Sequence, residues 1–250
     1  MSNSTYDLII IGNGIIGYTI ALKSFLKNKN IKIAIIGSRA REQGGTVASG
    51  AMLGCFCELS KKSLINPLLK KKFETSIQAQ KQWEPWLDII NSYADMLSDR
   101  VAINNGTFLI INSESGKLDE ENFDTILEAA EKYNEPYDRV HPKDIPSMST
   151  SETSRPTSSL FFPKEGAIDP IVLLQAMEKI FLNFKNFTLI NDVVDKINTE
   201  TSKINSLQLN KGDTIIGSKY VLAAGQATQY LIDQIDDIKD RIPITFSGGG

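Results

Sequence analysis

The first structural unit of the chain begins with Tyr6-Asp7-Leu8-Ile9-Ile10-Ile11-Gly12-Asn13-Gly14-Ile15-Ile16-Gly17. The apolar run at residues 8–11 is typical of a strand in a parallel sheet that is covered on both faces. A G-x-G-x-x-G pattern follows it. Gly12 allows a tight turn, Gly14 lets a pyrophosphate approach the backbone, and Gly17 lets the next helix pack close to the strand. We interpret the stretch as a dinucleotide-binding turn rather than a glycine turn without a ligand.

The residues after this turn complete a β-α-β unit. Apolar residues recur at helical spacing over 15–26, and residues 31–36 form a second apolar run that predicts a parallel strand. Such a unit usually carries Asp or Glu at the end of the second strand, where it binds the ribose. Here Gly37 or Ser38 stands in that place. Arg39 and Arg41 follow, and they either suit a 2′-phosphate, as in an NADP-dependent reductase, or pair with acidic side chains.

The rest of the chain alternates between helical and strand patterns. Residues 44–54 are almost all small, which indicates a backbone packed closely against a ligand. A helical pattern covers 64–97, and we expect Pro85 to divide it into two helices. Further expected elements are strands at 106–111, 160–162, 187–194, 203–209 and 213–223, and helices at 119–133 and 169–182. We therefore predict one domain from 1–100 and 215–250, interrupted by a second domain at 101–214.

Composition excludes several classes of protein. The chain has 250 residues with 27 basic and 30 acidic side chains, a net charge of −3, so no basic field is present to attract nucleic acid. Its two cysteines, Cys55 and Cys57, lie too close in sequence for a disulfide scaffold. No apolar run is long enough to span a membrane, and no basic signal region precedes the first strand. We expect a cytoplasmic protein with no nucleic-acid or membrane partner.

Five motifs occur in a fixed order along nearly the whole chain, at residues 6–17, 45–54, 105–110, 163–170 and 221–225. As a set they resemble the glycine oxidase and D-amino-acid oxidase family of flavin-dependent amine oxidoreductases, most closely its glycine oxidase branch. The resemblance implies an α/β fold. A discontinuous, Rossmann-like FAD-binding domain would hold an inserted α+β substrate domain, and both would be incomplete in this chain.

The resemblance also implies noncovalent FAD as the cofactor. Residues implied to bind it are Gly12, Gly14, Ile15, Ile16 and Gly17 at the pyrophosphate; Ser38 and Arg39 at the adenosine ribose; Gly45, Thr46, Ser49, Gly50, Ala51 and Met52 along the isoalloxazine and ribityl chain; Val193 or Val194 at the adenine; and Ala224 and Gly225 after the late strand. Similar proteins oxidise the Cα–N bond of an amino acid or related amine by hydride transfer to flavin N5. The resulting imine hydrolyses to the oxo acid. We assign no catalytic residue.

Family members are longer than this chain, and the missing part would carry the arginine that pairs with the substrate carboxylate. We therefore expect a second polypeptide to complete the active site, with residues 247–250 as a candidate cleavage junction; a truncated product is the alternative. Two other functions stay open: a noncatalytic FAD-binding subunit of a heteromeric complex, and an NADP-dependent reductase. Cys55 and Cys57 follow the flavin-facing run, and we interpret them as buried and unreactive.

Overall fold

The computed structural model describes residues 5–41, 44–95, 100–148, 151, 153–201, 203–236 and 238. The chain forms two compact units: the first contains residues 1–49, 93–96 and 170–250, and the second contains 50–92 and 97–169. The boundaries of these units differ from those of the domains expected from the sequence, which were 1–100 with 215–250 for one domain and 101–214 for the other. The candidate junction at 247–250 lies outside the described residues. The functional boundaries of the two domains stay a prediction.

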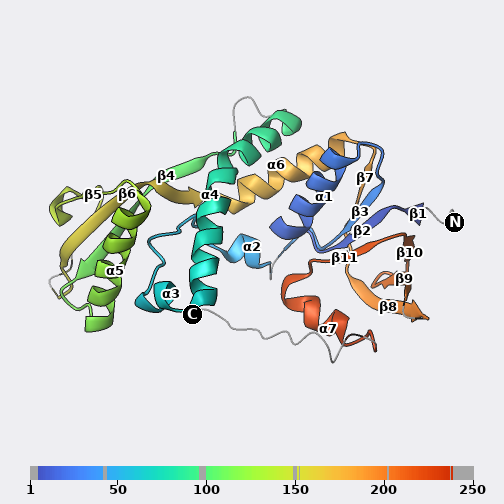
Figure 1. Cartoon of the computed structure of the whole chain (residues 1–250). Helices are drawn as coiled ribbons and strands as arrows, with labels where there is room; N and C mark the ends of the chain where they lie inside the picture. Colours follow the sequence, from blue (N-terminus) through green and yellow to red (C-terminus); the bar gives the residue numbers. More distant parts are fainter. Residues whose placement is uncertain are drawn as a thin grey trace. The chain divides into compact units, whose positions relative to one another are not determined.

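A parallel sheet forms the centre of the first unit. Its strand order is β11 (Tyr220–Leu222), β2 (Leu8–Ile11), β3 (Ile33–Ile36) and β7 (Phe187–Ile190). Helices α1 (Ile15–Lys27) and α6 (Pro170–Asn183) lie side by side and pack against these strands (Figure 1). All residues of β2 and β3 are buried, as their continuous apolar runs predicted. The β-α-β unit expected from the sequence is present, and the α/β fold class is confirmed.

A second sheet belongs to the same unit, in the order β1 (Thr5–Tyr6), β10 (Thr214–Gly217), β9 (Lys203–Leu209) and β8 (Val194–Glu200). Buried Ile197 and Leu207 of this sheet share a core with Ile9 and Ile36 of the parallel sheet. Leu231 of the short helix α7 (Thr228–Ile232) joins the same core. This layer buries one face of β2 and β3.

Each of two strands expected from the sequence is divided into two separate strands in the structure. Residues 187–194 divide into β7 and the start of β8, and residues 213–223 divide into β10 and β11. The halves pair with different sheets. At the first break the Asp192 carboxylate accepts a hydrogen bond from the Val193 N–H, which stabilises a turn inside the apolar run.

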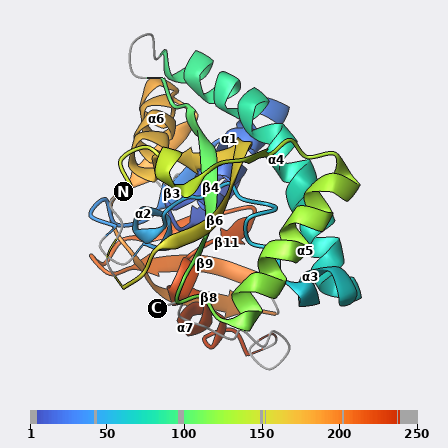
Figure 2. The ribbon, with the colours of Figure 1, turned by 90° about the vertical axis from the view of Figure 1, so that its left-hand side faces the viewer.

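The second unit is an antiparallel sheet with helices. Its strands are β4 (Ile103–Asn112), β6 (Pro156–Ile168) and β5 (Asp138–Arg139), and a single turn, η1 (Pro142–Asp144), follows β5. Its helices are α3 (Lys61–Ile65), α4 (Pro67–Ala94), of which residues 67–92 belong to this unit, and α5 (Lys117–Tyr133). Helix α5 packs against β4 (Figure 2). Phe56, Phe73, Phe123 and Phe162 are buried in its core.

Helix α4 runs through Pro85 without a break, so the expected division into two helices is wrong. A proline inside a helix costs roughly 3 kcal/mol because it removes one backbone hydrogen bond. Pro85 itself is exposed, while Phe73, Leu87 and Ile90 are buried on either side of it. Burial of these side chains outweighs the proline. Neither α4 nor any other helix among the described residues is long and apolar enough to cross a membrane.

Candidate dinucleotide-binding site

The turn after β2 can be built only with glycine at two positions. Gly12 has φ +118°, and a Cβ placed on it would lie 2.1 Å from the carbonyl oxygen of Ala223. A Cβ on Gly17 would lie 2.0 Å from the carbonyl oxygen of Gly12. Both distances are impossible for real atoms. The first and third glycines of the motif therefore hold β2, β11 and α1 close together, as the sequence predicted.

Gly14, the second glycine of the motif, lies at the start of helix α1. It is the N-cap of α1, has no side chain to cap the helix, and is followed by a first turn without acidic residues. The nearest atom to a Cβ on Gly14 would be Thr46 Oγ1, at 3.2 Å. The Ile15 N–H donates to the same oxygen over 3.2 Å, and the Ile16 side chain is largely exposed. Such a helix end is suited to a phosphate, because its N–H groups and dipole favour negative charge.

The end of β11 meets this glycine turn. The Ala223 N–H donates to the carbonyl oxygen of Ile11, and the backbone of Ala223 and Ala224 lies directly against Gly12. Gly225 then adopts φ +56°, which lets the chain enter the short turn η2 (Gly225–Ala227). The structure thus brings the predicted residues Ala224 and Gly225 next to the predicted phosphate turn.

A second part of the site lies where β3 and β7 end, and we call it the strand-end pocket. Ser38 accepts a hydrogen bond at its carbonyl oxygen from Asn13 Nδ2 over 2.9 Å, and the Arg39 N–H donates to Asn191 Oδ1 over 2.9 Å. The pocket is lined by Asn13, Tyr18, Ile35, Gly37, Arg39, Glu178, Leu189, Ile190 and Asn191. The structure therefore places Ser38 next to Asn13 of the glycine turn and Arg39 next to Asn191, and their role at a ribose stays a prediction.

A partly buried ion pair lies at the edge of this pocket. Arg41 Nη2 is 2.9 Å from Glu178 Oε2 and donates to the Tyr18 hydroxyl oxygen over 2.6 Å. Burial, opposed by the neighbouring Arg41, raises the pKa of Tyr18 to about 12. Arg41 is thus paired with an acidic side chain, the second of the two alternatives open from the sequence. Sequence reasoning missed Tyr18 and Glu178, because no local pattern connects them to the glycine turn.

The predicted flavin-facing run is divided between the two units. Gly45 and Thr46 begin α2 (Gly45–Ala48) in the first unit, and Ser49 Oγ donates to the carbonyl oxygen of Thr46 over 2.8 Å. Gly50, Ala51 and Met52 belong to the second unit.

In the second unit this run is fastened to β6. Met52 forms an isolated bridge with Ala167, and the Leu53 N–H donates to the carbonyl oxygen of Gly166 over 2.7 Å. The Ile168 N–H in turn donates to the carbonyl oxygen of Ala51 over 3.2 Å. Residues 51–53 therefore extend the edge of the β4-β6-β5 sheet.

A buried carboxylate holds the segment that follows this run. Glu165 of β6 is 0% exposed and accepts the backbone N–H groups of Cys55, Phe56 and Cys57 over 2.6, 2.5 and 3.1 Å. Burial raises the pKa of the Cys55 thiol, and burial together with Glu165 raises that of Cys57. Both thiols are thus held protonated. Cys55 is buried, as expected, whereas Cys57 is only half-buried. The sequence showed Glu165 only as part of a motif.

The adenine-side candidates lie before and in β8. The Val193 N–H donates to Asp192 Oδ1 and its carbonyl oxygen accepts from the Asn210 N–H over 3.0 Å, so both main-chain groups of Val193 are already used. Val194 is buried at the start of β8. The assignment of either valine to adenine stays a prediction.

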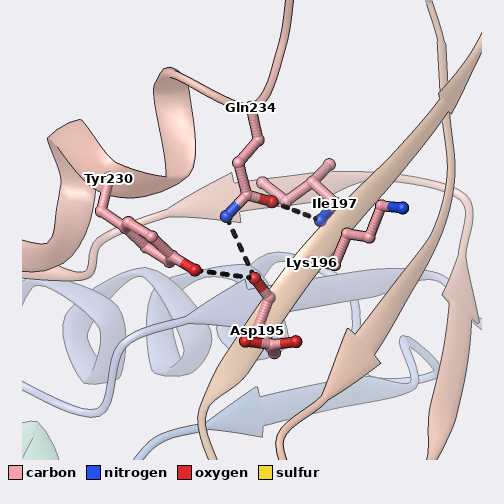
Figure 3. Close-up of a pocket in the computed structure, with 5 residues that line it drawn as sticks. All are labelled: Asp195, Lys196, Ile197, Tyr230 and Gln234. Atoms are coloured by element: carbon pink, nitrogen blue, oxygen red, sulfur yellow. Dashed lines mark hydrogen bonds between the residues drawn. The ribbon is translucent and has the colours of Figure 1, made fainter.

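A separate pocket lies between β8 and the segment that includes α7 (Figure 3). Gln234 donates to the carbonyl oxygen of Asp195 over 3.0 Å and accepts the Ile197 N–H over 2.9 Å. The Tyr230 hydroxyl also reaches the carbonyl oxygen of Asp195, over 3.5 Å. These contacts attach the chain after Gly225 to an edge strand, so we assign this pocket a structural role.

The fold matches those of solved amino-acid oxidoreductases. Glycine oxidase from Bacillus cereus has a TM-score of 0.67 and 20% identity over 92% of this chain. Glycine oxidase from Geobacillus kaustophilus has a TM-score of 0.70 and 18% identity over 93%. L-proline dehydrogenase from P. horikoshii has a TM-score of 0.66 and 17% identity over 97%. The chain spans 58% of the length of each.

A search of curated proteins by sequence gives no match. The family model for FAD-dependent oxidoreductases of the DAO type matches residues 7–249, which is almost the entire chain. The matched range contains the glycine turn, the strand-end pocket and the Glu165 segment. This chain therefore belongs to the DAO family of FAD-dependent oxidoreductases.

Proposed function

We propose that this chain binds FAD at the glycine turn and takes part in oxidising the Cα–N bond of an amino acid or related amine. The observation that carries the proposal is the turn itself, with two sterically required glycines and a helix start at Gly14, which has no side chain of its own to cap the helix. When bound, FAD supplies the hydride acceptor, flavin N5. The glycine oxidases and L-proline dehydrogenase with the same fold support amino acids as the substrate class.

The residues of this chain have binding and positioning roles in the proposal. The N–H groups at the start of α1 bind the pyrophosphate, and Thr46 fixes the position of Ile15 beside it. In the second unit, Ala51 and Met52 lie in a segment that β6 and Glu165 hold in place, and the role of this segment at the flavin stays a prediction.

A second polypeptide that completes the active site belongs to the same proposal. The solved relatives contain structure that this chain does not match, since it spans 58% of their length. A noncatalytic FAD-binding subunit is the alternative, and it predicts bound flavin that no amine reduces. An NADP-dependent reductase predicts binding of NADP in place of FAD.

Titration of FAD into the purified 250-residue chain, followed by flavin fluorescence, tests cofactor binding. We expect Gly14→Ala to weaken FAD binding by about 10-fold or more, because its Cβ enters the approach of the pyrophosphate. Gly116→Ala is the matched control. Gly116 is also a helix N-cap, and a Cβ on it would meet only Asp119 Oδ2, at 4.0 Å. No FAD binding by the wild type, or equal binding by Gly14→Ala, would contradict the proposal.

Anaerobic mixing with amino acids and secondary amines then tests the reaction. Bleaching of the flavin absorption, by the chain or by the complex purified natively with it, is the expected result. Flavin that stays oxidised in every native preparation would favour the noncatalytic subunit.

A further inference from the structure

The usual position of the ribose-binding carboxylate is closed in this chain. Gly37 follows β3, and a Cβ on Gly37 would lie 2.3 Å from Asn13 Cγ. Asn13 is fixed there because its Nδ2 donates to the carbonyl oxygen of Ser38. An acidic side chain at position 37 would therefore collide with Asn13. Ribose recognition in the strand-end pocket therefore cannot use a carboxylate at position 37.

A carboxylate reaches the same pocket from a different element. Glu178 projects from α6, its side chain is only 18% exposed, and it lines the pocket together with Gly37 and Asn191. Because α6 packs beside α1, this side chain lies on the same side of the sheet as the glycine turn.

One oxygen of Glu178 is hydrogen-bonded to its neighbours, and the other makes only a long ion pair. Oε2 is 2.9 Å from Arg41 Nη2 and 3.5 Å from the Tyr18 hydroxyl. Oε1 lies 3.6 Å from Arg39 Nε, which is longer than a hydrogen bond. A carboxylate oxygen accepts two hydrogen bonds, so Oε1 can accept from a hydroxyl group.

The residue that orients Glu178 is itself held in a costly conformation. Arg41 has φ +49°, a region that residues with a side chain avoid, and its side chain is only 13% exposed. Its Nε is buried and has no hydrogen-bond partner among the described residues. Such a residue persists only when its surroundings fix it, and such conformations concentrate at ligand sites. Here the fixed group is Arg41 Nη2, which contacts both Glu178 and Tyr18.

We propose that Glu178 accepts the adenosine ribose hydroxyl of the dinucleotide, in place of the carboxylate that usually ends the second strand. Arg41 and Tyr18 are positioning residues that hold Glu178 Oε2, and Oε1 faces the ligand. The inference rests on the proposed FAD binding.

The test uses the 250-residue chain with two ligands, FAD and an FAD analogue that lacks the 2′-hydroxyl of the adenosine ribose. We expect the wild type to bind FAD about 10-fold tighter than the analogue, as a hydrogen bond to a charged group allows. In Glu178→Gln the Kd for FAD rises about 10-fold, and the preference for FAD over the analogue falls about fivefold. Glu200→Gln is the matched control, an exposed carboxylate of β8 that does not line the pocket.

The outcomes distinguish failure of the role of Glu178 from failure of the proposed FAD binding. FAD binding by the wild type without preference over the analogue overturns the role of Glu178 and leaves the proposed function standing. An unchanged preference in Glu178→Gln, with equal weakening of both ligands and a lower melting temperature, assigns Glu178 a purely structural role and overturns the inference. Absence of FAD binding in the wild type overturns the proposed function as well. The wild-type comparison needs no variant to fold.

Discussion

Replacing Glu165 by Gln is expected to destabilise the second unit strongly. The carboxylate is fully buried and accepts three consecutive backbone N–H groups, those of Cys55, Phe56 and Cys57. Glutamine has nearly the same shape but only one acceptor oxygen. Its Oε1 can keep the bonds to Cys55 and Phe56, which Glu165 Oε1 accepts. Its Nε2 then faces the Cys57 N–H, so two donors oppose each other.

The magnitude follows from these three bonds. A hydrogen bond to a charged group contributes about 1.5–3 kcal/mol and a neutral one about 0.5–1.5 kcal/mol, so two weakened bonds cost about 2 kcal/mol. The Cys57 N–H, left without an acceptor, costs about 1–3 kcal/mol more. Removing a buried charge offsets part of this loss. We expect a net loss of about 3 kcal/mol, or a fall in melting temperature of about 6–12 °C.

Urea unfolding followed by tryptophan fluorescence measures this loss. The two tryptophans of the chain, Trp83 and Trp86, both lie in the part of α4 that belongs to the second unit, so the signal reports on the unit that contains Glu165. Glu58→Gln is the matched control, because Glu58 is exposed and adjacent to the same segment. Equal unfolding midpoints for Glu165→Gln and the wild type would refute the reasoning that these three bonds hold residues 55–57.

Two further predictions concern titration. Burial raises the pKa of Cys55, and burial together with Glu165 raises the pKa of Cys57. Both thiols should therefore react with a disulfide reagent at pH 8 at least about 10-fold more slowly in the native protein than in urea. Rapid labelling of the native protein would show that the thiols are not held protonated. Burial also raises the pKa of Glu135 above its ordinary value of 4.5. The protonated carboxyl group therefore contributes fully to the free energy of unfolding below pH 4.5, and this contribution is lost as the pH rises through the raised pKa. Glu135→Gln should therefore be more stable than the wild type at pH 7, by a margin that narrows toward pH 4.5; a margin independent of pH, measured by urea unfolding, would contradict this.

Local patterns in the sequence were sufficient for the first β-α-β unit and for the start of α6 at Pro170. The apolar run of β2, the glycine turn and the apolar spacing of α1 act within a few residues, so their conformations follow from local sterics and burial. The requirement for Gly12 and Gly17 was predictable for the same reason, and the structure confirms it.

Local patterns failed where an element pairs with distant partners. Residues 213–223 were expected to form one strand, but β10 pairs with β1 and β9 whereas β11 pairs with β2. Pro85 was expected to divide a helix, but buried side chains on both sides keep α4 continuous. In both cases packing between remote segments outweighs the local preference.

The sequence alone thus determined the family, the parallel strands and the phosphate turn, because these depend on neighbouring residues. Only the tertiary structure decided how polar groups are satisfied in the interior. Asn13 closes the strand end at Gly37, Glu178 reaches that pocket from α6, and Glu165 binds a segment that precedes it by more than a hundred residues. A buried carboxylate needs partners wherever the fold supplies them, and no spacing along the chain encodes that choice.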